Sequence, residues 1–263
     1  MLFLALVLAT RREALLSLLG SRAARRTLML FGVGLYLSQI TYAISIEMTN
    51  AGTATVLQAT CTVFVMLFTC LRARRLPRPA DFAGLVAALA AAALIATQGD
   101  WGVIVLPAAG LAWGIANALS ETLYIMAPQR LYGRWDRVTI IGVGMVVSGA
   151  AAAIMWLATA AASLSPASGA APLVPALDAV GWLALIGGVG VLGTFAAFGL
   201  FLYGVSLVGS VKGSLLGVAE PVGAMVIAAV WLGTPFSAAD WGGLVLMAAM
   251  IALVSLSGSR EKQ

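Results

Sequence analysis

Long apolar runs separated by short polar joints dominate the chain. A bilayer core of about 30 Å needs about 20 apolar residues per helix. Eight runs reach that length, at 27–46, 51–71, 80–98, 102–127, 138–162, 177–203, 214–232 and 239–257. The opening run, 1–9, is too short to cross a membrane and is interpreted as the last half of a helix. The pattern predicts an all-α, polytopic transmembrane helix bundle with eight full spans and an N-terminal partial helix.

The composition agrees with a protein embedded in lipid. The chain is 62% apolar and 10% charged, whereas a soluble domain is about 45–50% apolar and about 25% charged. The 15 Lys and Arg residues form short clusters between apolar runs, which argues against a nucleic-acid partner. With no histidine, the chain lacks His-ligated metal sites and Ser–His or Cys–His relays. We therefore expect the bilayer as a partner, no metal, no cofactor and no enzymatic activity.

The basic residues indicate how the chain crosses the membrane. They occupy alternate joints, at 11–12 and 22–26, 72–78, 130–137, Lys212 and 260–262. Short loops that hold Lys and Arg stay in the cytoplasm. The pattern therefore predicts a multi-pass inner membrane protein with a cytoplasmic C-terminus. The Ser-, Ala- and Pro-rich stretch 163–175 is then an outer loop.

Two segments of the chain resemble each other at nearly constant spacing. Tyr42-Ala-Ile-Ser45 resembles Tyr203-Gly-Val-Ser206, and 80–86 (ADFAGLV) resembles 239–245 (ADWGGLV). The expected topology places Asp81 on the cytoplasmic side and Asp240 on the outer side. An odd number of helices per unit produces such inversion, which many secondary transporters use. We therefore expect two inverted five-helix repeats, 1–100 (truncated) and 101–258, followed by a cytoplasmic tail, 259–263.

These features resemble the EamA-type transporters of the drug/metabolite transporter superfamily. The resemblance includes the two five-helix units, the sequence Ala219-Glu220-Pro221-Val222 and the Ala-Asp-aromatic start of each last helix. It implies a ten-helix inner membrane carrier that exports amino acids, nucleobases or other small metabolites. Relative to that pattern, the chain starts inside the second helix. Gly233-Thr234-Pro235 also stands where members usually carry Gly-Glu.

Glu220 and Pro221 form one candidate site within the seventh expected span. A charge at the centre of a span costs about 2.5–3.5 kcal/mol on insertion scales, so an intramembrane carboxylate suggests a function. Pro221 would free a carbonyl beside Glu220, giving a proton, cation or amine site. Alternatively, Pro221 only kinks the helix and Glu220 pairs with a neighbour. Gln58 is nearly equivalent in the first unit, and either faces the same cavity or makes an interhelical hydrogen bond.

A second polar stripe lies on the fourth expected span. Asn117, Glu121 and Tyr124 follow i, i+4, i+7 spacing, so they share one face of a helix. They would line a vestibule for cationic or zwitterionic substrates, unless Glu121 reaches water or pairs with Arg130. Trp113, one turn earlier, could stack on a substrate, although packing is the simpler role.

Small residues suggest where helices approach closely. Gly209, Gly213 and Gly217 form one stripe, and Gly110 and Gly114 form another. Such stripes allow close contact between helix backbones. Cys61 and Cys70 are interpreted as small apolar fillers.

The sequence favours a secondary transporter that exports small metabolites, including amino acids, nucleobases or cationic drugs, by alternating access. No glycine-rich nucleotide loop is present, so transport driven by the chain's own ATP hydrolysis is not expected. The alternative is a truncated, non-transporting remnant or an accessory membrane subunit. The oligomeric state, monomer or homodimer, is left open.

Overall fold

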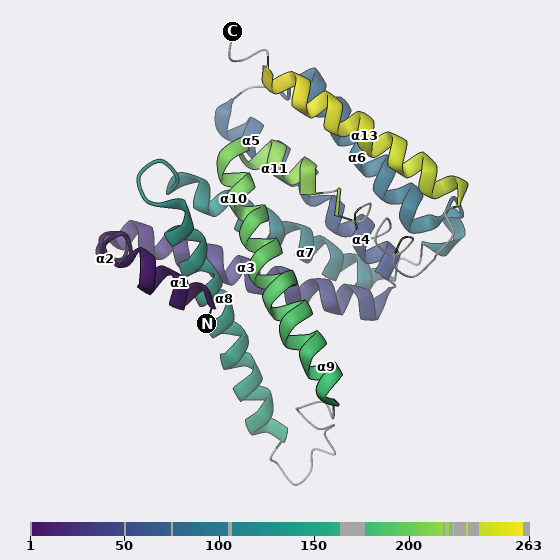
Figure 1. Ribbon diagram of the computed structural model, residues 1–263. Helices are drawn as coiled ribbons and strands as arrows, with labels where there is room; N and C mark the ends of the chain where they lie inside the picture. Colours follow the sequence, from purple (N-terminus) through teal and green to yellow (C-terminus); the bar gives the residue numbers. More distant parts are fainter. Residues whose placement is uncertain are drawn as a thin grey trace.

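The chain folds into a bundle of helices (Figure 1). The computed structural model describes residues 2–259 except 50, 75, 105–106, 164–176, 218, 221–222, 224–229 and 231–236. The long helices are α3 (Arg22–Met48), α6 (Pro79–Thr97), α7 (Ala108–Met126), α8 (Arg137–Ser163) and α13 (Ala238–Ser259). The shorter ones are α1 (Leu2–Thr10), α2 (Arg12–Gly20), α4 (Ala51–Ala59), α5 (Cys61–Ala73), η1 (Trp101–Val103), η2 (Ala127–Arg130), α9 (Ala179–Leu183), η3 (Ala184–Phe198, a π-helix), α10 (Gly199–Val208) and α11 (Ser210–Gly217).

The apolar runs are helical where the structure describes them. In the described residues, four segments are long and apolar enough to cross a membrane: Arg22–Met48, Thr53–Ala73, Arg137–Ala161 and Ala179–Val208. They coincide with the first, second, fifth and sixth expected spans. Helices α6, α7 and α13 cover the third, fourth and eighth. The all-α class is therefore confirmed, while the total of eight spans stays a prediction.

Some expectations fall outside the described residues, and one helix was not expected. Only the start of the seventh span, 214–217, belongs to a described helix, α11, and most of its other residues lie outside the described part of the chain. The expected outer loop, apart from residue 163, and the stretch 233–235 also lie outside it. Helix α2 occupies a stretch that the sequence suggested was only a polar joint. It forms because Leu15 and Leu18 share one face and are both buried.

Helices α6 and α13 form an antiparallel pair (Figure 1). The Ser237 hydroxyl, just before α13, donates a hydrogen bond of 2.6 Å to Oε1 of Gln98, just after α6. The C-terminal end of α6 therefore lies beside the N-terminal end of α13. Since Asp81 and Asp240 each lie in the first turn of their helix, they occupy opposite ends of the pair. This antiparallel packing is compatible with the inverted repeat, which stays a prediction.

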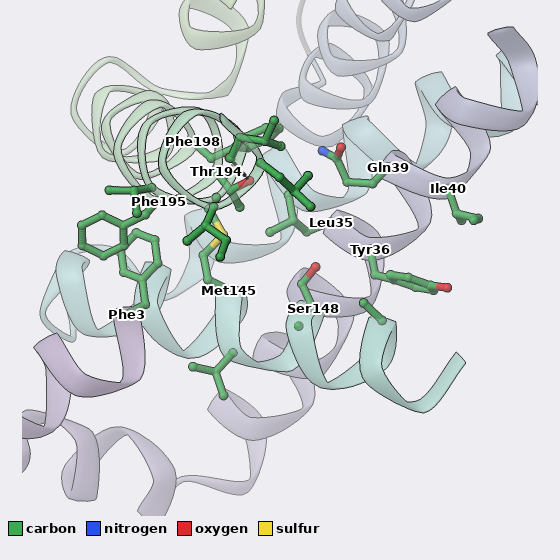
Figure 2. Close-up of a pocket in the computed structure, with 18 of the residues that line it drawn as sticks. Phe3, Leu35, Tyr36, Gln39, Ile40, Met145, Ser148, Thr194, Phe195 and Phe198 are labelled. Atoms are coloured by element: carbon green, nitrogen blue, oxygen red, sulfur yellow. Dashed lines mark hydrogen bonds between the residues drawn. The ribbon is translucent and has the colours of Figure 1, made fainter. Parts of the chain in front are cut away.

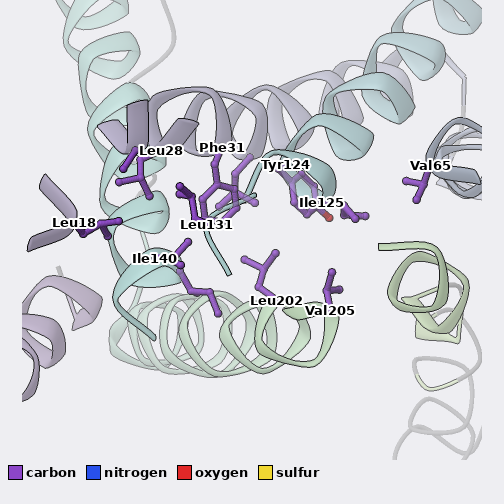
Figure 3. Close-up of a cluster of buried hydrophobic side chains, with 13 residues drawn as sticks. Leu18, Leu28, Phe31, Val65, Tyr124, Ile125, Leu131, Ile140, Leu202 and Val205 are labelled. Carbon is purple, nitrogen blue, oxygen red and sulfur yellow. The ribbon is translucent and has the colours of Figure 1, made fainter. Parts of the chain in front are cut away.

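Helix α3 packs between α7 and α8. Its contact with α8 depends on two glycines. A Cβ atom added to Gly144 would lie 2.0 Å from Cε1 of Phe31, and one added to Gly32 would lie 2.4 Å from Cβ of Val147. Phe31 is fully buried in the main hydrophobic cluster, which also contains Tyr124 of α7 (Figure 3). The two glycines therefore set the distance between α3 and α8.

The glycine stripes have different roles. A Cβ atom on Gly110 would lie 2.3 Å from Cγ2 of Thr49, and one on Gly114 would lie 2.4 Å from Cδ1 of Leu57. A Cβ atom added to Gly213 would lie 2.6 Å from Cγ2 of Val205, and one added to Gly217 would lie 3.0 Å from Cε2 of Phe201. Gly209 differs from the expected packing role, because a Cβ there would meet nothing within 4 Å. Its φ of 89° instead lets the chain turn between α10 and α11.

Candidate functional site

The second span is interrupted near its middle, between α4 and α5. The Thr60 amide donates to the Leu57 carbonyl at 3.1 Å, and the Thr60 hydroxyl donates to the same carbonyl at 2.5 Å. This three-residue pairing replaces the regular four-residue spacing of an α-helix at that point. The interruption places Gln58 and Cys61 on either side of Thr60.

A similar interruption follows α11. The Ala219 amide donates to the Leu216 carbonyl at 3.1 Å, again over three residues, directly before Glu220. Helix interruptions inside membrane proteins occur where the backbone is buried in protein or lines a cavity. Pro221, expected to contribute to this break, lies outside the described residues. The candidate site therefore includes two interrupted helices, one from each half of the chain.

The Glu121 carboxyl group lies between these interruptions. Glu121 is 8% exposed and sits on α7, which contacts α4, α5 and α11. Its Oε1 accepts a 3.0 Å hydrogen bond from the Tyr124 hydroxyl. The side chains of Gln58 and Cys61 are close enough to interact with the carboxyl group, and Glu220 acts on it electrostatically. The structure thus brings three of the predicted residues together: Glu121, Tyr124 and Gln58. Glu220 is exposed and influences the carboxyl group only electrostatically.

One oxygen of this buried carboxyl group remains unsatisfied. Within the described part of the chain, Glu121 Oε2 has no hydrogen-bond partner of good geometry. The nearby Gln58 and Cys61 side chains therefore interact with the group without saturating it. The same part of the chain shows no ion pair between Glu121 and Arg130. A buried polar atom without a partner is costly, so this oxygen is an acceptor that a proton or a donor group of a ligand would satisfy.

Asn117 and Trp113 have other environments. Asn117 is buried, and its Nδ2 donates a 2.7 Å hydrogen bond to the Ser38 carbonyl of α3. This bond joins α7 to α3. Trp113 is 39% exposed and lies about 12 Å along the helix axis from Glu121. Asn117 Oδ1 has no hydrogen-bond partner among the described residues. We propose that Asn117 serves mainly in helix packing and that Trp113 lies apart from the cluster.

Cys61 is the site residue that the sequence interpretation missed. The interpretation of Cys61 as a small apolar filler explains why it is buried, but it does not explain why it lies beside Glu121. Its backbone carbonyl also accepts a 3.4 Å hydrogen bond from the Thr122 hydroxyl of α7. Cys61 follows Gln58 by three residues, a spacing that places two side chains on one face of a helix. This spacing was the sequence feature that could have identified Cys61 as a site residue.

A mainly apolar cavity lies elsewhere in the bundle. It has a volume of about 800 Å³ and is lined by mainly apolar residues of α3, α8 and η3, with Phe3 at one end (Figure 2). The Phe3 and Phe195 rings lie 4.4 Å apart there. None of the residues of the Glu121 cluster lines it. Because none of the described residues that line it is charged, this cavity does not offer the chemistry of the predicted site.

Replacing Asn117 with leucine should destabilise the bundle without abolishing transport. The substitution removes the hydrogen bond to Ser38, and interhelical bonds of this kind contribute about 0.6 kcal/mol on average, up to about 1.7 kcal/mol. Thermal unfolding in detergent micelles measures the effect. Ser120→Ala is the matched control, because the Ser120 hydroxyl bonds only within α7, to the Ala116 carbonyl. Equal stability of Asn117→Leu and Ser120→Ala would contradict the packing role.

Comparisons with known proteins agree with this arrangement of helices. The model of the EamA-like transporter family matches residues 108–256. The chain is 29% identical to the uncharacterized inner membrane transporter YicL of Salmonella typhimurium over 266 residues, covering 99% of this chain and 84% of YicL.

A solved crystal structure has the same fold, with a TM-score of 0.75 at 18% identity, covering 99% of this chain and 84% of that one. These relationships point to transport rather than catalysis, and they confirm the resemblance identified from the sequence. The family model covers more than half of the chain, so the protein belongs to the EamA-like transporter family and is a multi-pass inner membrane transporter.

Proposed function

We propose that the protein is a secondary transporter that binds a small cationic or zwitterionic metabolite at the Glu121 carboxyl group. Amino acids, nucleobases and cationic drugs are the cargo classes to examine, with export as the physiological direction. The observation that carries the proposal is the contact of the buried Glu121 carboxyl group with Tyr124 and with Gln58, which lies beside the interruption between α4 and α5. Glu220, at the second interruption, adds an electrostatic influence on this carboxyl group.

The hydrogen bonds of the site favour a ligand with a positively charged or N–H donor group. The Tyr124 hydroxyl donates a hydrogen bond to Oε1 of Glu121, whereas Oε2 has no hydrogen-bond partner among the described residues. An ammonium group would provide the missing donor and balance the buried charge. The Gln58 amide can both donate and accept a hydrogen bond. It therefore suits a ligand that carries a carboxylate or carbonyl besides its amine.

Alternating access requires two halves that move against each other around this site. The antiparallel α6–α13 pair and the interruptions after α4 and α11 support the assignment of inverted repeats at 1–100 and 101–258. Glu121 and Glu220 come from the second unit and Gln58 from the first. Rocking of one unit against the other would open the site to one side of the membrane and then to the other.

Transport assays with inverted membrane vesicles test the proposal. Vesicles that contain the protein should accumulate a radiolabelled substrate from the amine-containing classes when a proton gradient is imposed. Vesicles from cells lacking the protein provide the background. If no candidate substrate accumulates above that background, the accessory-subunit alternative is favoured instead.

Tyr124→Phe should weaken transport less than removal of the carboxylate. The substitution removes the 3.0 Å hydrogen bond to Glu121 and keeps the aromatic ring in the core. A hydrogen bond to a charged group contributes about 1.5–3 kcal/mol. Taking the lower end of that range, we expect kcat/KM to fall about 10-fold. In a Glu121→Gln background, Tyr124→Phe should have a smaller effect. Full additivity of the two substitutions would show that Tyr124 acts independently of Glu121.

A further inference from the structure

A polar cavity, separate from the Glu121 cluster, lies at the joint before α8. Its volume is about 350 Å³, and its walls come from three segments that are distant in sequence. Arg11 comes from the joint between α1 and α2, Arg134 and Arg137 come from the loop and first turn of α8, and Tyr203 comes from α10. Helix α1 packs against α8 (Figure 1), which brings the first arginine to this loop.

The loop that forms one wall is compact. The amides of Arg134 and Trp135 both donate to the Leu131 carbonyl, at 3.1 and 3.3 Å. Gly133 has a φ of 92°, which closes the turn in a conformation that other residues rarely adopt. Asp136 then caps α8, because its Oδ2 accepts hydrogen bonds from the Thr139 amide and hydroxyl at 2.9 and 2.8 Å. The position of the arginines is therefore set by the backbone.

The residues that line the cavity carry a net positive charge. Asp136 is the only acidic residue among the described residues that line it, and its Oδ1 lies 3.9 Å from a terminal nitrogen of Arg11. Within the described residues, Arg134 and Arg137 form no ion pair. The start of α8 adds the positive end of a helix dipole. Three arginines and one aspartate line the cavity. About two positive charges therefore remain available to bind an anion.

Buried donors near the cavity also lack partners. Arg137 Nε and the Tyr132 hydroxyl are both buried and make no hydrogen bond within the described part of the chain. Burial raises the pKa of Tyr132, and the nearby Arg137 guanidinium lowers it only in part. The hydroxyl is thus a neutral donor at physiological pH. A basic joint that only fixes membrane orientation does not require donors to be buried without acceptors.

Trp135 and Tyr203 place the cavity at the level of lipid headgroups. Both aromatic residues line it, and such residues concentrate at membrane–water interfaces. Basic pockets between helices at this level bind anionic headgroups. A phosphate diester also matches the planar, bidentate hydrogen-bonding geometry of arginine.

We propose that the cavity formed by Arg11, Arg134, Arg137 and Tyr203 binds a phosphate group, presented by the headgroup of an anionic phospholipid. The site is independent of the proposed transport function. Arg134 and Arg137 bind the phosphate oxygens, and Trp135 and Tyr203 contact the adjoining glycerol.

Thermal unfolding of the purified full chain in detergent micelles tests this site. Phosphatidylglycerol, phosphatidylcholine with the same acyl chains, and inorganic phosphate are titrated separately. We expect phosphatidylglycerol to raise the apparent Tm more than phosphatidylcholine does. In Arg134→Gln and in Arg137→Gln, the midpoint concentration for phosphatidylglycerol should rise about fivefold. Arg130→Gln is the matched control, because Arg130 is an exposed arginine of the same joint that does not line the cavity.

The arms of the experiment distinguish the possible outcomes. If inorganic phosphate alone gives the full, Arg134-dependent stabilisation, the phosphate site is supported and its ligand is soluble. Equal stabilisation by both lipids with no effect of phosphate would overturn the proposal. The proposal would also be overturned if Arg130→Gln raised the midpoint concentration for phosphatidylglycerol as much as Arg134→Gln does. The overall charge of the protein would then explain the binding. Arg134 is exposed, so Arg134→Gln decides the result even if Arg137→Gln does not fold.

Discussion

Glu121→Gln is expected to reduce gradient-driven transport about 100-fold while leaving the fold intact. The carboxyl group is buried, bonded to Tyr124 at Oε1 and unsatisfied at Oε2. Glutamine has nearly the same shape and can still accept the Tyr124 hydrogen bond, but it carries no negative charge. Loss of one partner of a buried charge pair costs about 3–5 kcal/mol, and 3 kcal/mol corresponds to somewhat more than 100-fold.

Transport into inverted vesicles provides the measurement, with the amount of folded protein determined by gel filtration. Glu47→Gln is the matched control, since it makes the same chemical change at an exposed position near the end of α3. The control should retain wild-type transport. Equal gradient-driven transport by Glu121→Gln and Glu47→Gln would remove Glu121 from the mechanism.

The largest expected effect on stability comes from Gly144→Ala. The added methyl group would lie 2.0 Å from Cε1 of Phe31, which is fully buried between α3 and α8. Because Phe31 is fully buried, either its ring must leave its packed position or α3 and α8 must separate. Overpacking of this kind costs about 1–3 kcal/mol, and we expect a value near the upper end of that range.

Unfolding by sodium dodecyl sulfate measures this loss, with Gly149→Ala as the control on the same helix. A Cβ atom at Gly149 would meet nothing within 4 Å, and alanine is the better helix former. The control should therefore be neutral or slightly stabilising. A Gly144→Ala protein as stable as Gly149→Ala would show that α3 and α8 do not pack at this distance.

The lengths of the apolar runs predicted much of the fold because the bilayer constrains helices strongly. Helix α2 was missed, since Leu15 and Leu18 make only a short apolar face among charged residues. The interruption at Thr60 was also missed. Neither glycine nor proline marks it, and the Thr60 hydroxyl bond to the Leu57 carbonyl depends on a rotamer that no spacing rule specifies.

The candidate site was predicted in its residue types but not in its geometry. The spacing of Asn117, Glu121 and Tyr124 correctly placed all three on a buried face of α7. It did not separate Asn117, which bonds to α3, from Glu121, which faces α4 and α5. That distinction depends on which helices surround α7. The role of Gly209 depended in the same way on backbone conformation, because a glycine stripe does not reveal which member adopts a positive φ.

The opposite orientation of the two halves in the membrane is the central claim, and single-cysteine labelling tests it most directly. In a Cys61→Ala, Cys70→Ala background, cysteine is introduced at Leu76, before α6, or at Ala238, the first residue of α13; both positions are exposed. A membrane-impermeant maleimide is then added to spheroplasts and to inverted vesicles. The account predicts that Ala238→Cys reacts only in spheroplasts and Leu76→Cys only in inverted vesicles. Reaction of both positions from the same side would contradict it.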